Sequence, residues 1–263
     1  MENRLIELDG KMAQLAERMG AFPQSLRYIP TDFTAKLDLS WIYHDHALEG
    51  VVLSYSELKA AIDSRIISDV TLIPMYEEIK RQKEAIDWIR DQAAQQRAAK
   101  KRPAITMDLV KKLLDFLSPE LAGKQIQYRK ENPIHRLYYH DIAQPDKIQA
   151  AVKKLVDWIE DDEAQSMHIV KRAAFAHYRL LAIYPWTKNS GRVARLLMNY
   201  MLVREGYMPC VVHYTDRQRY YEVMRNENAG ILPLVVDSLT NGVDTALKFL
   251  DEVQTVRRQK RAS

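Results

Sequence analysis

The chain has 263 residues, of which 47% are hydrophobic and 28% are charged, a balance that excludes an intrinsically disordered chain. The formal net charge of only +4 makes nucleic acid an unexpected partner, and the single cysteine, Cys210, excludes an intramolecular disulfide. The segment after Met1 lacks the apolar core of a signal peptide, and no apolar run approaches the ~20 residues of a membrane span. We therefore expect a cytoplasmic protein that does not bind membranes.

The first predicted helix carries an apolar seam with alternating spacings of three and four residues. The seam consists of Leu5, Leu8, Met12, Leu15 and Met19. Because it is shorter than the ~3–4 heptads of a sustained coiled coil, it predicts docking onto the chain's own body rather than a dimeric coiled coil. Pro23 and Pro30 predict an extended segment over 20–38. Together with the helix before it, this segment is expected to form an N-terminal helical extension over 1–38.

The rest of the chain is expected to be mainly α, because glycine is scarce (8 of 263) and apolar residues recur every three or four positions. A helix over 39–48 should stop at Gly50, and Ser54-Tyr55-Ser56-Glu57 has the pattern of a capped helix start. Further helices are predicted over 74–92, 107–117, 145–160, 166–182, 191–205, 215–227 and 231–250, before a basic tail at 251–263.

Residues 125–143 interrupt the helical pattern. The β-prone runs 125–129 and 136–140 flank Glu131-Asn132-Pro133, which has turn chemistry. This arrangement predicts a β-hairpin.

The strongest functional signal lies between the helices predicted at 166–182 and 191–205. Pro185 ends the first helix, and a polar loop opens the second. The first N–H groups of a helix lack intrahelical partners, and the helix dipole favours an anion there. The predicted phosphate cradle consists of Asn189, Ser190, Gly191, Arg192 and Arg195. From the pattern alone, the alternative to a phosphate site is an ordinary helix start with two arginines on the surface.

The segment Tyr184-Pro185-Trp186-Thr187-Lys188-Asn189-Ser190-Gly191-Arg192-Val193-Ala194-Arg195 resembles the loop His-Pro-Phe-x-Asp/Glu-Gly-Asn-Gly-Arg-x-x-Arg of the Fic (Fido) domain family of protein adenylyltransferases. The flanking stretches 174–180, 194–200 and 205–207 resemble that family as well. The resemblance covers roughly 40–245. It implies a Fic-type helical bundle with one β-hairpin flap, in a domain over 39–250.

The same resemblance implies a set of functional residues. ATP or another nucleotide would bind Thr187, Lys188, Asn189, Ser190, Gly191, Arg192, Arg195 and Asn228. A target protein would pair with the hairpin flap, at Tyr128, Arg136, Tyr138 and Tyr139. Fic proteins often self-associate, so a homodimer is an open possibility. Ala47-Leu48-Glu49-Gly50 resembles an inhibitory helix, in which Glu49 would pair with Arg195; the family usually has Ser or Thr where this chain has Asp45.

Three departures from the family loop change the expected chemistry. Tyr184 replaces the catalytic histidine, and a phenol with a reference pKa near ~10 is a poor base. Lys188 replaces the acidic magnesium ligand, which argues against magnesium and suggests direct contact with a phosphate. Asn189-Ser190 replaces Gly-Asn.

We therefore favour a pseudoenzyme or repurposed scaffold without standard AMP transfer. A transferase using another base (His140, His177 or His213) and a non-enzymatic interaction module stay open. No metal site is expected, because the spacing of His44 and His46 does not place both on one helix face.

Overall fold

The fold was derived from a computed structural model, which describes residues 1–63, 69–97, 99, 102–133, 141–225 and 230–262. The described chain is mainly α-helical, as predicted, and none of its helices combines the length and apolar content needed to cross a membrane. In chain order the helices are α1 (Glu2–Gly20), α2 (Tyr28–Leu48), α3 (Tyr55–Ile62), α4 (Ile73–Arg97), α5 (Met107–Leu117), α6 (Ile148–Ile159), α7 (Asp162–Ser166), α8 (Ile169–Ile183), α9 (Ser190–Arg204), α10 (Arg217–Arg225) and α11 (Ile231–Ala262). Short 3₁₀ turns lie at Gln24–Leu26, Val70–Leu72, Pro119–Leu121, Pro145–Lys147 and Tyr214–Asp216.

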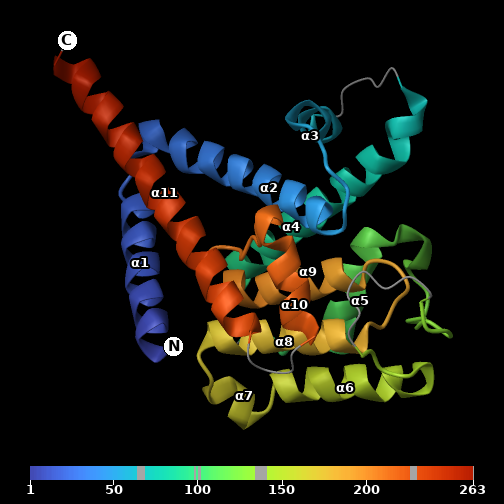
Figure 1. Cartoon of the computed structure of the whole chain (residues 1–263). Coiled ribbons are helices and arrows are strands. Elements are labelled where there is room, and N and C mark those ends of the chain that lie inside the picture. The colour runs from blue at the N-terminus through green and yellow to red at the C-terminus, as the bar shows by residue number, and fades with distance from the viewer. Residues whose placement is uncertain (64–68, 98, 100–101, 134–140, 226–229, 263) are drawn as a thin grey trace.

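Helix α9 forms the centre of the core. All of its residues are buried, and it packs against α4, α5 and α8, while α6 packs on the other side of α8 (Figure 1). Helix α11 also packs against α8. A helix that is buried all round must find partners for its polar side chains inside the protein. Asn199 does so by accepting a hydrogen bond from the Cys210 N–H at 2.7 Å and donating one to the Cys210 carbonyl at 3.1 Å.

Helices α1 and α11 lie side by side and run parallel at one edge of the molecule (Figure 1). The seam docks onto the chain's own body as predicted, with Leu5, Leu8, Met12 and Leu15 buried. Three ion pairs with the same sequence offset fix the register of the two helices: Arg4–Asp237, Lys11–Asp244 and Arg18–Asp251. The partners advance by seven residues on each helix, which is the repeat of a two-helix seam.

The extended segment predicted over 20–38 is wrong for its second half, because α2 already begins at Tyr28. Pro30 falls in the first turn of this helix, where its missing N–H would have had no intrahelical partner. A proline at this position is therefore compatible with the helix. The division into 1–38, 39–250 and 251–263 stays a prediction.

The predicted β-hairpin is also wrong: the described parts of 125–143 contain no strand. The backbone groups bond elsewhere, since the Arg129 N–H donates to the Pro185 carbonyl at 3.0 Å and the Ala143 N–H donates to the Ala182 carbonyl at 3.3 Å. The segment is thus tied to the end of α8 and the loop after it. Of the predicted flap residues, Tyr128 packs its ring against Trp186, while Arg136, Tyr138 and Tyr139, together with His140, lie outside the described residues.

Candidate anion-binding loop

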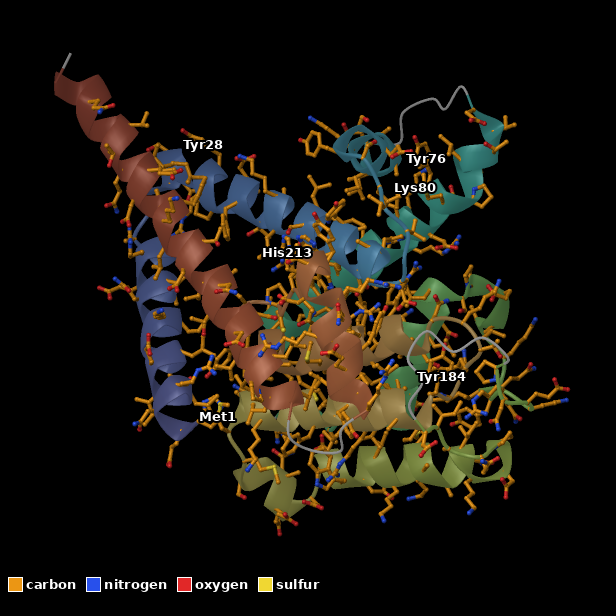
Figure 2. All side chains as sticks on the ribbon, in the orientation of Figure 1. Met1, Tyr28, Tyr76, Lys80, Tyr184 and His213 are labelled. Atoms are coloured by element: carbon orange, nitrogen blue, oxygen red, sulfur yellow. The ribbon has the colours of Figure 1, made fainter. Side chains whose placement is uncertain are left out.

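The loop that joins α8 to α9 turns through two residues with left-handed backbone. Tyr184 has φ 50° and Asn189 has φ 66°. Asparagine tolerates this region, whereas a bulky residue such as tyrosine adopts it at a cost. Arg129 offsets that cost, because its Nε donates to the Tyr184 carbonyl at 2.7 Å. Tyr184 lies at the end of α8 far from Met1 (Figure 2).

The side chains of Asn189 and Ser190 hold the shape of the loop. The Asn189 amide donates to the Leu117 carbonyl at 3.1 Å and to Ser118 Oγ at 3.0 Å, at the end of α5. Ser190 Oγ accepts a hydrogen bond from the Trp186 N–H at 2.9 Å and donates to the Trp186 carbonyl at 2.6 Å. At this start of α9 the groups that face an incoming anion are therefore backbone N–H groups rather than these two side chains.

Two basic side chains of the candidate site differ in how they are engaged. Arg192 is buried, and its Nη1 donates to Glu78 Oε2 of α4 at 3.0 Å. The Glu78 side chain is 47% exposed, so this partner is accessible to competition from solvent or ligand. Lys188 and Thr187 are exposed, and within the described residues no ion pair involves Lys188.

Arg195 is held by two carboxylates at the C-terminal end of α2, Asp45 and Glu49. Its Nε donates to Asp45 Oδ1, and its Nη2 donates to Glu49 Oε1 at 2.8 Å. Its Nη1 also reaches the hydroxyl of Tyr220 at 3.3 Å. Asp45 and Glu49 are one helical turn apart, so both face the same arginine. The ion pair between Glu49 and Arg195 that the resemblance implies is present, and Asp45 forms a second ion pair with the same arginine.

Asp45 is one of the most enclosed charges of the protein. It is 3% exposed, and its second oxygen accepts a hydrogen bond from Gln82 Nε2 at 2.6 Å. Burial raises the pKa of Asp45, while Arg195 and Arg192 act in the opposite direction. A buried carboxylate is stable only when it is paired and hydrogen-bonded, so Asp45 and Arg195 depend on each other.

Two of the histidines considered as replacement bases, His177 and His213, contact other side chains of the protein. His177 Nε2 is hydrogen-bonded to the Tyr220 hydroxyl at 2.9 Å, and burial, followed by the charge of Arg195, lowers the pKa of His177 to about 3. The His213 ring lies 4.1 Å from that of His44, beneath α2 (Figure 2). Burial also raises the pKa of Tyr184, so its phenol stays protonated at neutral pH.

The sequence interpretation missed Asp45 and Glu78 as partners of the loop arginines, and Gln82 as a partner of Asp45. Asp45 had a readable signal, since it lies four residues before Glu49 and so on the same helix face. Glu78 and Gln82 had none, because Glu78 lies 114 residues from Arg192 and Gln82 lies 37 residues from Asp45, and only the tertiary fold joins them. Asn228 lies outside the described residues.

The fold and the site together describe a helical protein whose central helix, α9, begins at a loop followed by two buried arginines, Arg192 and Arg195. A sequence model of the Fic/DOC family matches residues 103–202, and this match supports membership of the Fic family. It is 28% identical over 193 residues to a protein adenylyltransferase Fic of Nematostella vectensis, covering 72% of this chain and 43% of that protein. A protein adenylyltransferase Fic of Drosophila willistoni is 28% identical over 239 residues, covering 89% and 45%. The chain thus spans less than half the length of these relatives.

Solved structures show the same fold. A Fic domain-containing signaling protein of Bacteroides thetaiotaomicron superposes with a TM-score of 0.75 at 24% identity, covering 95% of this chain and 98% of that one. Fic-1 (residues 134–508) of C. elegans gives 0.73 at 20% identity, covering 94% and 71%.

Proposed function

We propose that this protein is a nucleotide-binding member of the Fic family that is held closed by its own carboxylates and does not perform standard AMP transfer. The observation that carries the proposal is the state of Arg195, which is buried at the start of α9 and neutralised by Asp45 and Glu49. Burying an arginine against two carboxylates is expensive in desolvation, which fits an anion-binding group kept in reserve. Relatives named protein adenylyltransferases support a nucleotide as the ligand and a protein as the partner.

The residues of the loop explain why AMP transfer is not expected. The family's histidine takes a proton from the attacking hydroxyl, and the protonated Tyr184 phenol cannot do so. Losing a general base typically reduces the rate by ~10²–10⁴-fold. Tyr184 can still donate a hydrogen bond to a bound anion.

Magnesium does not fit this loop. The ammonium group of Lys188 occupies the position of the family's acidic ligand, and an ammonium group repels a divalent cation. The carboxylates of Asp45 and Glu49 are already bound to Arg195. Lys188 would instead supply positive charge directly to the phosphates of ATP or another nucleotide.

Thermal unfolding of the natural chain and of Glu49→Gly, with ATP, CTP, GTP, UTP and ADP, tests the proposal. A nucleotide at ~100 times its Kd stabilises the native state by about 2.7 kcal/mol. We expect Glu49→Gly to be stabilised more than the natural chain, with equal shifts in magnesium and in EDTA. Absence of stabilisation in both proteins would contradict nucleotide binding and favour an interaction module.

A second experiment separates the binding protein from an active transferase. The double variant Tyr184→His, Lys188→Asp restores the base and the metal ligand. In a Glu49→Gly background it is expected to incorporate labelled AMP into itself or a lysate protein in the presence of magnesium, while Glu49→Gly alone incorporates none. Incorporation by Glu49→Gly alone would contradict the loss of AMP transfer.

A further inference from the structure

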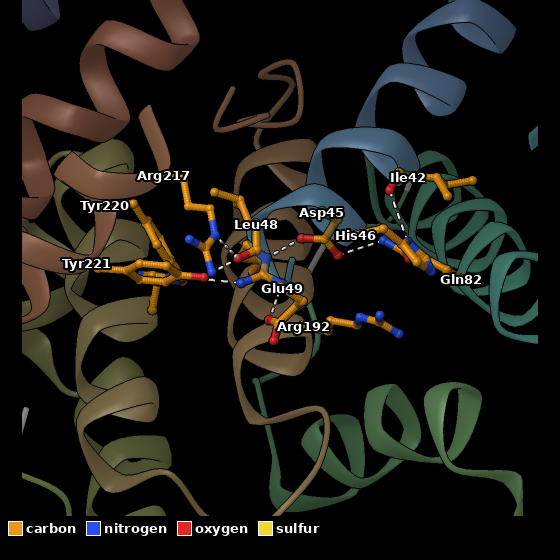
Figure 3. A network of polar contacts seen from close by, with 12 residues as sticks. Ile42, Asp45, His46, Leu48, Glu49, Gln82, Arg192, Arg217, Tyr220 and Tyr221 are labelled. Carbon is orange, nitrogen blue, oxygen red and sulfur yellow. Dashed lines mark hydrogen bonds and ion pairs between the residues drawn. The ribbon is translucent and has the colours of Figure 1, made fainter. Parts of the chain in front are cut away.

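The last turn of α2, which carries Glu49, is held from outside by α10. The Leu48 carbonyl lies at the C-terminal end of α2, where a carbonyl has no partner within its own helix. It accepts hydrogen bonds from the Tyr221 hydroxyl and from Arg217 Nε, the latter at 2.9 Å (Figure 3). The Arg217 guanidinium also lies 4.9 Å from the centre of the Tyr221 ring, so the two donors support each other.

This carbonyl belongs to the peptide unit that leads into Glu49. Holding it therefore fixes the direction in which the Glu49 side chain leaves the backbone. On the other side the turn is closed by its own backbone: the Glu49 and Val51 N–H groups both donate to the His46 carbonyl at 3.0 Å. Gly50, at φ 92°, completes the turn.

Two consecutive tyrosines of α10 thus touch the two sides of the ion pair. Tyr220 reaches Arg195 at 3.3 Å, and Tyr221 reaches the backbone next to Glu49. Both tyrosines are buried. A shift of α10 would therefore move the arginine and the carboxylate differently, which would weaken their 2.8 Å contact.

We propose that Arg217 and Tyr221 are positioning residues that keep Glu49 on Arg195 and thereby set the affinity of the loop for a nucleotide. The affinity part of this inference rests on the proposed function. The positioning part concerns only the Leu48 carbonyl and the turn that follows it. Neither residue needs to contact the ligand.

Hydrogen exchange tests the positioning part without any ligand. Tyr221→Phe keeps the ring and removes one of the two donors to Leu48. We expect the backbone amides of Glu49 and Val51 to exchange about fivefold faster, the effect of losing one typical hydrogen bond. The matched control is Arg219→Gln on the same helix, whose partner is Asp237 of α11 and which should leave these amides unchanged. Unchanged exchange in Tyr221→Phe would overturn the proposal.

Titration with ATP tests the affinity part through a double-variant cycle. Tyr221→Phe is expected to tighten ATP binding severalfold in the natural chain and to have no effect in the Glu49→Gly background, because its action passes through Glu49. Weaker binding in both backgrounds would mean that Tyr221 contacts ATP directly, which overturns the proposal. If Glu49→Gly binds no ATP, nucleotide binding fails, and the exchange experiment still decides the positioning role.

Discussion

Replacing Asp45 by asparagine keeps the shape of the side chain and removes one negative charge from the interior. In the natural protein this carboxylate accepts hydrogen bonds from Arg195 Nε and from Gln82 Nε2 at 2.6 Å, so both of its oxygens face donors. An amide offers only one acceptor and turns its NH₂ group toward the other donor. Asp45→Asn therefore loses one hydrogen bond and half of the charge that neutralises Arg195.

The size of the effect follows from burial. Breaking a buried ion pair by removing one partner costs about 3–5 kcal/mol, because the other charge stays buried without compensation. In Asp45→Asn, Arg195 still has Glu49 as an ion-pair partner at 2.8 Å. The variant also avoids the free-energy cost of burying the charge of Asp45. The loss should thus lie at the lower end, about 3 kcal/mol.

Urea denaturation at neutral pH measures this loss, with Asp237→Asn as the matched control. Asp237 also binds two arginines, Arg4 and Arg219, but its side chain is 33% exposed, so its loss should cost less than about 1 kcal/mol. Glu49→Gln, with a side chain 23% exposed, should fall between the two. If Asp45→Asn costs no more than Asp237→Asn, the account of a buried carboxylate that depends on Arg195 is refuted.

Three further predictions concern the surroundings of the site. Gly50→Ala should destabilise by about 1–2 kcal/mol in urea denaturation, because its φ is 92°, whereas Gly10→Ala inside α1 should stabilise slightly; equal effects would contradict the left-handed turn. Asn199→Ala should cost about 2–4 kcal/mol and lower the Tm, since it strands the buried N–H and carbonyl of Cys210, and a loss below about 1 kcal/mol would show that those groups find other partners. Burial lowers the pKa of His46 to about 4 and that of His177 to about 3, so the unfolded chain binds more protons than the native one below the ordinary histidine pKa of about 6.5. Stability should therefore be unaffected by these residues above pH 6.5 and fall toward pH 4 by up to about 1.4 kcal/mol per pH unit for each histidine; a flat unfolding free energy between pH 6.5 and 5 would contradict their buried, neutral state.

Local sequence signals predicted most of the helices well. The apolar spacing of 107–117 matches α5, and Ser54 with Glu57 forms the capping box that starts α3. The start of α9 falls one residue before its predicted position, because Ser190 and Gly191 open the helix directly after the left-handed Asn189. In these segments amphipathic pattern and capping chemistry agree, and tertiary contacts do not override them.

Prediction failed where distant contacts decide the backbone. The segment 125–143 has strand propensity, but Arg129 binds the carbonyls of Tyr184 and Ala143 instead of supporting a hairpin. No local pattern shows that this arginine will bind the carbonyl of Tyr184, which lies 55 residues away, as well as the nearer carbonyl of Ala143. β-propensity describes a fit to a pleated surface, and no such surface is available there among the described residues.

The candidate site was predictable in its centre and not in its surroundings. The loop motif located Arg192 and Arg195, and the resemblance paired Glu49 with Arg195. The partners on α4 and α10 depend on how α4 packs against α9 and on how α10 places Tyr220 near Arg195, which the motif does not encode. The sequence left Arg192 open to a phosphate, whereas the structure pairs Arg192 with Glu78 and adds Asp45 to Glu49 on Arg195.

The central claim is that the loop is a nucleotide site closed by the carboxylates of α2. Isothermal titration of ATP into the double variant Asp45→Ser, Glu49→Gly tests it most directly, because this variant removes both carboxylates that neutralise Arg195 and gives α2 the serine common in the family. The account predicts saturable binding of one ATP per chain in EDTA, at least tenfold tighter than to the natural chain and abolished by adding Arg192→Ala to the folded variant. A folded double variant that binds no ATP would contradict the account.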